Sequence, residues 1–301
     1  MRIVSLLPSA TEIVCALGHG AELVGRSAEC DYPPEVRRLD VVMRPRAHDF
    51  DAPSAAIDRR VVEARSRSES LYTLDLDRLR ALAPDLLLTQ DLCGVCSVTD
   101  SEVMEACAAV GIRPAIVSLS PRTLPEVWSS VERIGEALGD PVSGRRLASS
   151  LRERARGGSS RGPRVAVVEW LDPPFLAGLW TPEIVEAGGG TPVGPAAGEP
   201  GVRTTWPEIA ALAPELLILS PCSFPVERTR SELADESLAA RVDSVTPFRG
   251  TFLADEAYFS RPGPRLTNGV DLVRRLLRRT PGTSAMPVVR WPERSPTEAA
   301  T

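Results

Sequence analysis

The chain has 301 residues, of which 43% are hydrophobic and 25% charged, the composition of an ordinary globular protein. This length predicts about two domains of roughly 150 residues each. With 35 basic and 40 acidic side chains the net charge is −5, which argues against nucleic acid or an anionic membrane surface as a partner.

The N-terminal segment predicts a cytoplasmic protein. Residues 1–8 hold one basic residue and a short apolar run that ends at Pro8, too short for the core of a signal peptide. No window approaches the ~18 apolar residues of a membrane span, so we expect no membrane insertion. A start codon assigned too far downstream would change the expectation to a periplasmic or extracellular protein.

The first part of the chain alternates between strand and helix signals. We expect strands at residues 3–7, 23–26, 86–88 and 113–117, and helices at residues 12–17, 76–83 and 101–110. Residues 41–70 are polar and rich in arginine, with one helical pattern at 55–64, and are expected to run over the surface. Alternating strands and helices predict a parallel sheet with right-handed crossovers.

The second part of the chain repeats this order after a helical connection. Residues 123–156 have a helical pattern with a break near Pro141. Strands are then expected at residues 164–168, 216–218 and 251–254, and helices at residues 182–187, 207–213, 231–240 and 270–279. Residues 281–301 are rich in Pro, Ser, Thr and charge, and are expected to be a loose tail.

An internal repeat indicates two lobes. The segment Leu82-Ala83-Pro84-Asp85-Leu86-Leu87-Leu88 returns as Leu212-Ala213-Pro214-Glu215-Leu216-Leu217-Ile218. In each copy a short helix stops at a proline and a buried strand follows. We therefore predict an α/β protein with two Rossmann-like lobes, each with a parallel sheet, joined by a single long backbone helix. The expected boundaries are 1–122 for the N-terminal lobe, 123–160 for the connecting helices, 161–280 for the C-terminal lobe and 281–301 for a flexible tail. Ligands of open α/β sheets lie beyond the carboxyl ends of the strands, so a cleft between the lobes is the expected binding site.

Four of the six cysteines follow predicted strands. Cys30, Cys93, Cys96 and Cys222 are therefore expected on the cleft side, and Cys93 and Cys96 form a Cys-x-x-Cys pair. Such thiolates can bind one soft metal ion, such as Zn, Fe or Co, or form a redox pair. The other two, Cys15 and Cys107, lie at apolar helix positions and are expected in the core. The chain has no Gly-x-Ser-x-Gly, HExxH or Walker motif, and we do not expect an enzyme.

Several segments resemble one protein family in the same order along the chain. They are the opening Arg2-Ile3-Val4-Ser5-Leu6-Leu7-Pro8-Ser9-Ala10-Thr11-Glu12, the loop Asp31-Tyr32-Pro33-Pro34, residues 79–86, the loop Asp172-Pro173-Pro174-Phe175, and Phe259-Ser260-Arg261-Pro262-Gly263-Pro264-Arg265. These segments resemble the helical-backbone (class III) substrate-binding proteins of ABC importers, and most of all the members that bind cobalamin. The resemblance covers about residues 1–280. It implies non-catalytic binding of cobalamin, or of a related corrinoid or metal chelate, between the lobes.

The residues can be examined for such a ligand. A corrinoid is a wide, flat, amphipathic disc that needs aromatic walls and a few polar groups. Aromatic residues that follow predicted strands are Tyr32, Trp170, Phe175, Trp180, Tyr258 and Phe259. By resemblance, Tyr32 and Phe175 occupy aromatic positions of the family. A carboxylate, Glu256, either faces the ligand or pairs with Arg261 or Arg265.

Two functions follow from these observations. The first is a corrinoid-binding protein whose partner is an ABC importer or a corrinoid-handling protein, in transport, storage or sensing. The second is a thiolate metal-binding or redox protein, or a metallochaperone, that uses Cys30, Cys93, Cys96 and Cys222 on the same fold.

Overall fold

The fold is described from a computed structural model of residues 1–46, 52–67, 69–90, 100–158, 161–278 and 288–292. The chain divides into two compact units. Unit 1 comprises residues 1–52, 56–153 and 262–264, and unit 2 comprises residues 53–55, 154–261 and 265–301. The two-lobed α/β fold expected from the sequence is confirmed, and each unit is described by itself below.

The sheet of unit 1 has six strands in the order β4-β3-β2-β1-β5-β6. Their bounds are β1 Ile3–Ser5, β2 Leu23–Ser27, β3 Asp40–Pro45, β4 Tyr72–Leu74, β5 Leu86–Thr89 and β6 Ala115–Ser118. All neighbours are parallel except β3 and β4, which are antiparallel. The sheet is therefore mixed, whereas the sequence predicts a parallel one.

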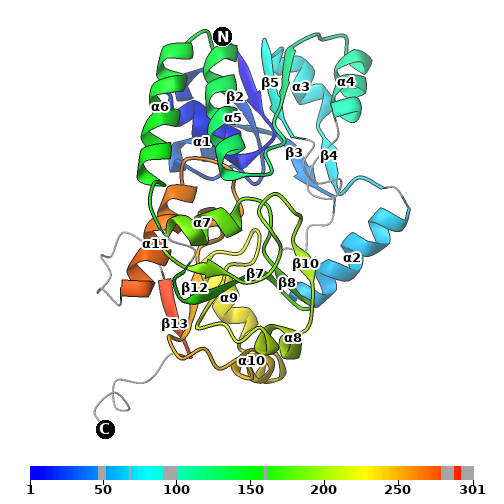
Figure 1. Ribbon diagram of the computed structural model, residues 1–301. Helices are drawn as coiled ribbons and strands as arrows, with labels where there is room; N and C mark the ends of the chain where they lie inside the picture. The colour runs from blue at the N-terminus through cyan, green and yellow to red at the C-terminus, as the bar shows by residue number, and fades with distance from the viewer. Residues whose placement is uncertain (47–51, 68, 91–99, 159–160, 279–287, 293–301) are drawn as a thin grey trace. The chain divides into compact units, whose positions relative to one another are not determined.

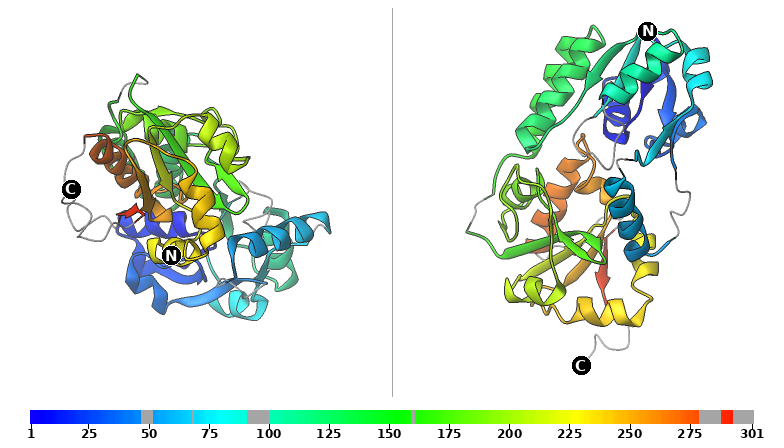
Figure 2. Two further views of the ribbon diagram at one scale, coloured as in Figure 1. Left: turned by 90° about the horizontal axis from the view of Figure 1, so that it is seen from below. Right: turned by 90° about the vertical axis from the view of Figure 1, so that its right-hand side faces the viewer.

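Among the described residues, the helical segments that lie wholly or mostly in unit 1 come before β7 in the chain (Figures 1 and 2). They are α1 Pro8–Ala16, η1 Gly20–Glu22, η2 Pro34–Arg38, α2 Ser54–Ser66, α3 Leu76–Leu82, α4 Asp100–Ala109, α5 Leu124–Ala137 and α6 Pro141–Arg154. The first residues of α2 and the last residue of α6 group with unit 2. The buried side chains of Val4, Leu79 and Leu87 are among those that form the core of this unit.

The expected single backbone helix is two helices, α5 and α6, with a turn at Gly139, whose φ is +74°. Both helices group with unit 1 up to Glu153. They approach closely because Gly135 and Gly144 face each other without side chains: a Cβ on Gly135 would lie 2.7 Å from the Cα of Gly144. The break follows from Pro141, which starts a helix well but cannot continue one.

The sheet of unit 2 has seven strands, with β10-β8-β7-β11-β12-β13 in order and β9 beside β7. Their bounds are β7 Arg164–Leu171, β8 Pro174–Leu176, β9 Thr191–Pro192, β10 Val202–Arg203, β11 Leu216–Leu219, β12 Thr251–Ala254 and β13 Val288–Trp291. The pairs β7·β11 and β11·β12 are parallel, while β7·β8, β8·β10 and β12·β13 are antiparallel. A parallel centre is thus flanked by antiparallel edges.

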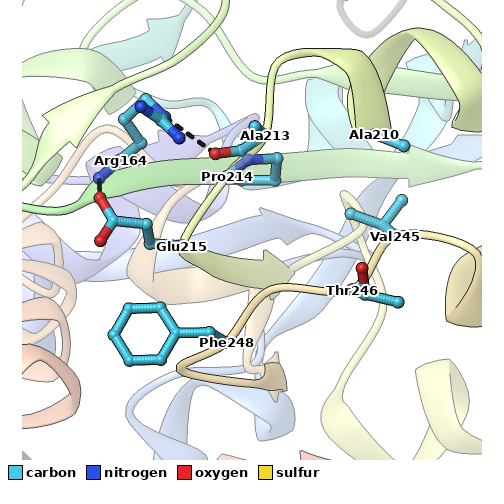
Figure 3. A pocket seen from close by; sticks show the side chains of 8 residues that line it. All are labelled: Arg164, Ala210, Ala213, Pro214, Glu215, Val245, Thr246 and Phe248. Carbon is cyan, nitrogen blue, oxygen red and sulfur yellow. Dashed lines mark hydrogen bonds between the residues drawn. The ribbon is translucent and has the colours of Figure 1, made fainter.

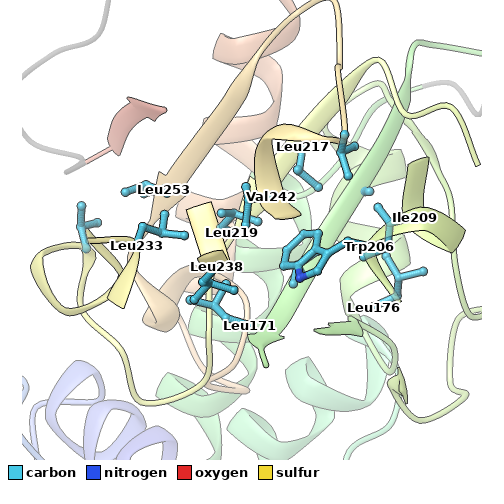
Figure 4. Packing of buried hydrophobic residues seen from close by; sticks show 14 residues of the cluster. Leu171, Leu176, Trp206, Ile209, Leu217, Leu219, Leu233, Leu238, Val242 and Leu253 are labelled. Carbon is cyan, nitrogen blue, oxygen red and sulfur yellow. The ribbon is translucent and has the colours of Figure 1, made fainter. Parts of the chain in front are cut away.

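Six helical segments complete unit 2. They are α7 Thr181–Ala187, α8 Trp206–Ala211, α9 Val226–Glu232, α10 Glu236–Asp243, η3 Glu256–Tyr258 and α11 Leu266–Arg278. Its core joins apolar side chains of β7, β11 and β12 to those of α8 and α10, with Trp206 at 2% exposure (Figure 4). The continuous apolar runs of the sequence are the central strands of this core.

The sequence repeat has a structural cause in each unit. In unit 1 the Asp85 carboxylate accepts a hydrogen bond from the backbone N–H of Arg2 at 2.7 Å, and in unit 2 Glu215 accepts one from Arg164 at 2.8 Å. Ala83, with φ of 41°, follows the last residue of α3 in the left-handed conformation. Each acidic residue thereby ties the turn before a central strand to the first residues of the neighbouring strand.

Two expectations about irregular segments are wrong. Residues 40–45 form β3, which pairs with β2 and with β4, although the region 41–70 was expected to run over the surface. In the expected tail, Val288–Trp291 forms β13, and the Trp291 indole N–H donates to the Asp243 carboxylate at 3.0 Å. β13 is an edge strand, and β3 lies between β2 and β4; both mix valine with arginine, so their composition resembles that of a loop.

Candidate ligand-binding site

One face of the β7–β8–β10 strands of unit 2 carries aromatic and basic side chains in a line. Trp170 of β7 is opposite Phe175 of β8, and Phe175 is opposite Arg203 of β10. Side chains directly opposite each other in antiparallel strands project from the same face. The Arg203 guanidinium lies over the Phe175 ring, 5.2 Å from its centroid.

The line continues past the carboxyl end of β11. There Phe224 packs against Trp170 with ring centroids 5.3 Å apart and a 55° angle between the rings. The guanidinium of Arg228, from α9, lies 4.9 Å from the Phe224 centroid. We call the set Arg228, Phe224, Trp170, Phe175 and Arg203 the aromatic row. Trp170 and Phe175 are partly exposed, Phe224 is 3% exposed, and Arg228 is paired with the Glu232 carboxylate at 3.5 Å. Trp170 lies at the carboxyl end of β7, and ligands of open α/β sheets bind beyond such ends.

Three predicted site residues lie inside unit 2 instead of on its surface. Trp180 is 3% exposed, Tyr258 6% and Phe259 2%. The Trp180 indole N–H donates to the carbonyl oxygen of Phe259 at 2.6 Å, which satisfies the one polar atom of the ring system. The expectation that these rings form a ligand wall is corrected: in this structure they pack α7 against η3.

Glu256 is also buried, and the pairing with Arg261 that the sequence leaves open is confirmed. The Arg261 Nη2 atom lies 2.6 Å from the Glu256 Oε1 atom, with the side chains 13% and 7% exposed. Burial raises the pKa of the Glu256 carboxyl to about 7 even though Arg261 acts in the opposite direction. A group with this pKa can change its charge near neutral pH.

Tyr32 and Cys30 lie on the loop after β2 in unit 1. Tyr32 is 46% exposed, which leaves its ring available to a ligand. Cys30 is 1% exposed, and its Sγ accepts a hydrogen bond from the Thr11 hydroxyl at 3.1 Å. Tyr32 therefore stays a candidate contact, whereas the Cys30 thiol is closed off as a metal ligand in this structure.

The remaining predicted metal ligands are only partly described. Cys222, in unit 2, is exposed, and its backbone N–H donates to the carbonyl oxygen of Glu169 at 3.0 Å. Cys93 and Cys96 lie outside the described residues. Within the described part of the chain, no group of three or more His, Cys, Asp or Glu side chains is arranged to hold a metal ion.

Two hollows in unit 2 are lined by residues other than those of the aromatic row. One, of about 250 Å³, is at the amino ends of β7 and β11, where Arg164 bonds to Ala213 and Glu215 (Figure 3). The other, of about 590 Å³, lies beside Trp206 and has the ion pair of Asp172 and Arg241 on its rim at 2.9 Å. Neither is lined by a predicted site residue, and the charged groups that line them are already paired.

Sequence reasoning missed Phe224, Arg203 and Arg228. Phe224 follows the second repeat strand by five residues, so the rule that singled out Cys222 could have found it. Arg203 is in a strand of two residues whose pairing with β8 has no sequence signal. Arg228 is recognised only once Phe224 is known to lie beneath it.

Comparisons with known proteins were made for the whole chain. No family model matches it. The chain is 24% identical over 274 residues to a vitamin B12-binding protein of Pectobacterium carotovorum, which covers 88% of this chain and 84% of that protein. It is 27% identical over 154 residues to one of Photorhabdus laumondii, covering 51% of this chain but only 44% of that protein.

The fold has well-matched solved counterparts. A periplasmic haem-binding protein of Pseudomonas aeruginosa aligns with a TM-score of 0.70 at 19% identity, covering 98% of this chain and 99% of that one. The periplasmic vitamin B12-binding protein of Vibrio cholerae gives 0.63 at 20% identity, covering 92% and 96%. None of the helices in the described ranges is long and apolar enough to cross a bilayer. In sequence the chain is thus similar to vitamin B12-binding proteins over most of its length, and its two-lobed α/β fold matches that of the solved haem-binding and vitamin B12-binding proteins.

Proposed function

We propose that the chain binds cobalamin, or a closely related corrinoid or metal chelate, without changing it chemically. The observation that carries this proposal is the similarity to a vitamin B12-binding protein along 88% of the chain. The aromatic row supports it, because exposed rings at the carboxyl ends of strands suit a wide, flat, amphipathic ligand. In unit 2 we propose Trp170 and Phe175 as ligand contacts, and in unit 1 we propose Tyr32 as one.

The contacts of such a ligand can be assigned by chemistry. The faces of Trp170 and Phe175 would cover apolar parts of the disc, and burial of an aromatic side chain contributes about 1.5–3 kcal/mol. Arg203 and Arg228 donate hydrogen bonds but cannot accept them, so they suit the amide carbonyl oxygens around a corrin ring. Glu256, paired with Arg261, is proposed to act only indirectly, through the packing of η3.

Haem is the second candidate ligand. It is favoured by Arg203 at one end of the aromatic row, because guanidinium groups pair with carboxylates such as haem propionates, whereas Arg228 at the other end is paired with Glu232. The similarity in fold to a haem-binding protein is compatible with this ligand. Cobalamin, whose ring substituents are amides, would gain less from the charge of Arg203.

A partner and a compartment belong to the proposal as well. We propose an ABC importer or a corrinoid-handling protein as the partner, since the fold is that of importer components. The cytoplasm is proposed as the compartment, whereas the two solved counterparts named above are described as periplasmic. Fractionation of cells that express the full gene, followed by immunoblotting, decides the compartment.

The thiolate metal site is left as the alternative, resting on Cys93, Cys96 and Cys222 with a soft metal ion such as Zn, Fe or Co. Metal analysis of protein purified under reducing conditions tests it. Stoichiometric metal that disappears in Cys93→Ser/Cys96→Ser, together with absence of corrinoid binding, would overturn the corrinoid proposal.

The site itself is tested by substitution. Trp170→Ala/Phe175→Ala is expected to weaken cobalamin binding at least tenfold, by analogy with aromatic anchors at other interfaces. Phe248→Ala is the matched control, because Phe248 is an exposed ring at the hollow of Figure 3. Equal loss of affinity in both variants, or none in the double variant, would contradict the assignment of the row. Equilibrium dialysis read by corrin absorbance measures both.

A further inference from the structure

Arg26, at the end of β2 in unit 1, ties together the two ends of a loop. Its side chain is 9% exposed. Nη1 donates to the carbonyl oxygens of Ser27 at 2.9 Å and Ala28 at 3.2 Å, while Nη2 donates to that of Arg37 at 2.9 Å. The first two carbonyls lie at the start of the loop of residues 28–37, and the third lies at its end.

Burial of the Arg26 guanidinium in this arrangement lowers the stability of the folded chain. Within the described residues Arg26 forms no ion pair with a carboxylate, and its Nε is buried without a hydrogen-bond partner. Burial lowers the pKa of the Arg26 guanidinium. A buried cation held only by carbonyl dipoles costs more than an apolar side chain of the same volume. What the guanidinium secures is therefore the conformation of the loop.

The rest of the loop is fixed around an exposed ring. The Cys30 backbone N–H donates to the Ser27 carbonyl at 3.1 Å, and its thiol is buried against Thr11. Val36 is also buried, at 4% exposure. Between these anchors Tyr32 is 46% exposed. The loop is a closed frame that presents one aromatic side chain.

We propose that Arg26 is a positioning residue for ligand binding: by closing the loop of residues 28–37 it holds Tyr32 where it meets the ligand. The inference rests on the proposed function, because Tyr32 acts only if a ligand binds. Holding the ring in place before binding removes the entropy cost of ordering it on contact.

A double-mutant cycle tests the link between Arg26 and Tyr32. Arg26→Lys keeps the charge but, as a compact ammonium on a flexible stem, cannot bond carbonyls at both ends of the loop. It is expected to raise the Kd for cyanocobalamin about tenfold, Tyr32→Ala by at least as much, and the double variant by no more than Tyr32→Ala alone.

Three results of the cycle would overturn the inference. The first is that the increases in Kd from the two substitutions multiply in the double variant. The others are an unchanged Kd in Arg26→Lys and an unchanged Kd in Tyr32→Ala. Arg38→Lys, an exposed arginine in η2, is the matched control and should leave the Kd unchanged. Arg26→Gln serves as a second variant should Arg26→Lys fail to fold.

A ligand-free measurement separates this inference from the proposed function. Amide exchange of residues 28–37 is expected to accelerate about tenfold or more in Arg26→Lys, while β1 and β5 keep their protection and show that unit 1 is folded. Unchanged exchange in the loop overturns the inference even where cobalamin binds. A wild type that binds neither corrinoid nor haem overturns the proposed function, and accelerated exchange then still assigns the loop closure to Arg26.

Discussion

Arg203 contributes a positive charge to the proposed site. It lies over the Phe175 ring, whereas Arg228 lies over the buried Phe224 ring and is paired with the Glu232 carboxylate at 3.5 Å. The rings are indifferent to the charge of a flat ligand, whereas the guanidinium groups favour carboxylates over amides. Discrimination between haem and cobalamin is therefore expected from Arg203.

Arg203→Gln is expected to weaken haem binding about tenfold and cobalamin binding by a factor of roughly three or less, because only haem offers carboxylates to this charge. Parallel absorbance titrations with the two ligands measure both effects. Arg164→Gln, at the amino end of β7, is the control and should change neither affinity. A larger loss for cobalamin than for haem would contradict the role given to Arg203.

Glu256 gives a pH dependence whose sign can be worked out. Its pKa rises from an ordinary value of 4.5 to about 7 in the folded chain, because burial outweighs the attraction of Arg261. The folded state therefore holds this proton more tightly than the unfolded state does. The stabilisation is complete below about pH 4.5 and is lost as the pH rises through about 7.

Glu256→Gln, which is neutral at every pH, should remove this dependence. Between pH 5 and pH 8 the Tm of the variant is expected to fall less than that of the wild type. Glu186→Gln, at an exposed position of α7, should follow the wild type. Equal falls in Tm for Glu256→Gln and the wild type would show that the buried carboxyl does not titrate in this range.

At the scale of elements, the crossing of α5 and α6 depends on two glycines. A Cβ on Gly135 would lie 2.7 Å from the Gly144 Cα and 3.0 Å from the Asp140 carbonyl oxygen, both backbone atoms that cannot turn aside. Alanine is the better helix former by about 1 kcal/mol, so helix propensity alone would stabilise the substituted helix. The close approach of α5 and α6 opposes this gain in stability, because the added Cβ would clash with backbone atoms.

Gly135→Ala is expected to lower the free energy of unfolding by about 1–2 kcal/mol, since overpacking outweighs the gain in propensity. Urea denaturation followed by circular dichroism measures the change. Ser149→Ala, on the exposed side of α6, should stay within about 0.5 kcal/mol of the wild type. A stabilised Gly135→Ala variant would mean that the helices separate without cost.

The elements that were predicted correctly from the sequence are buried strands with an almost wholly apolar composition. The strands β5 and β11 are runs of leucine and isoleucine covered on both faces, and their repeat pointed to two lobes. By contrast, β3 and β13 mix valine with arginine, and each pairs with a strand at or next to the edge of its sheet. Their pairing is decided by neighbours distant in the chain, which a local pattern does not contain.

The site shows the same division between local and distant information. Trp170 and Phe175 were found because they follow a strand in a loop that resembles a family. The burial of Trp180 and Phe259 was not found, because it depends on a contact between residues 79 positions apart. Arg203 depends on the register of two short strands. Residue type and position after a strand thus predict candidates, but packing decides which of them face a ligand.

At the scale of the whole molecule, one fold carries several ligand chemistries. The two solved counterparts named above are described as binding haem and vitamin B12, so the architecture alone does not choose between these ligands. In this chain the choice rests on few side chains: the rings of the aromatic row, its two arginines and Tyr32. The central claim is that they hold a corrinoid.

Isothermal titration of the purified full-length chain with cyanocobalamin tests that claim most directly. The account predicts one site per chain with a Kd of about 1 μM or tighter. Absence of binding at ligand concentrations up to about 1 mM would contradict it.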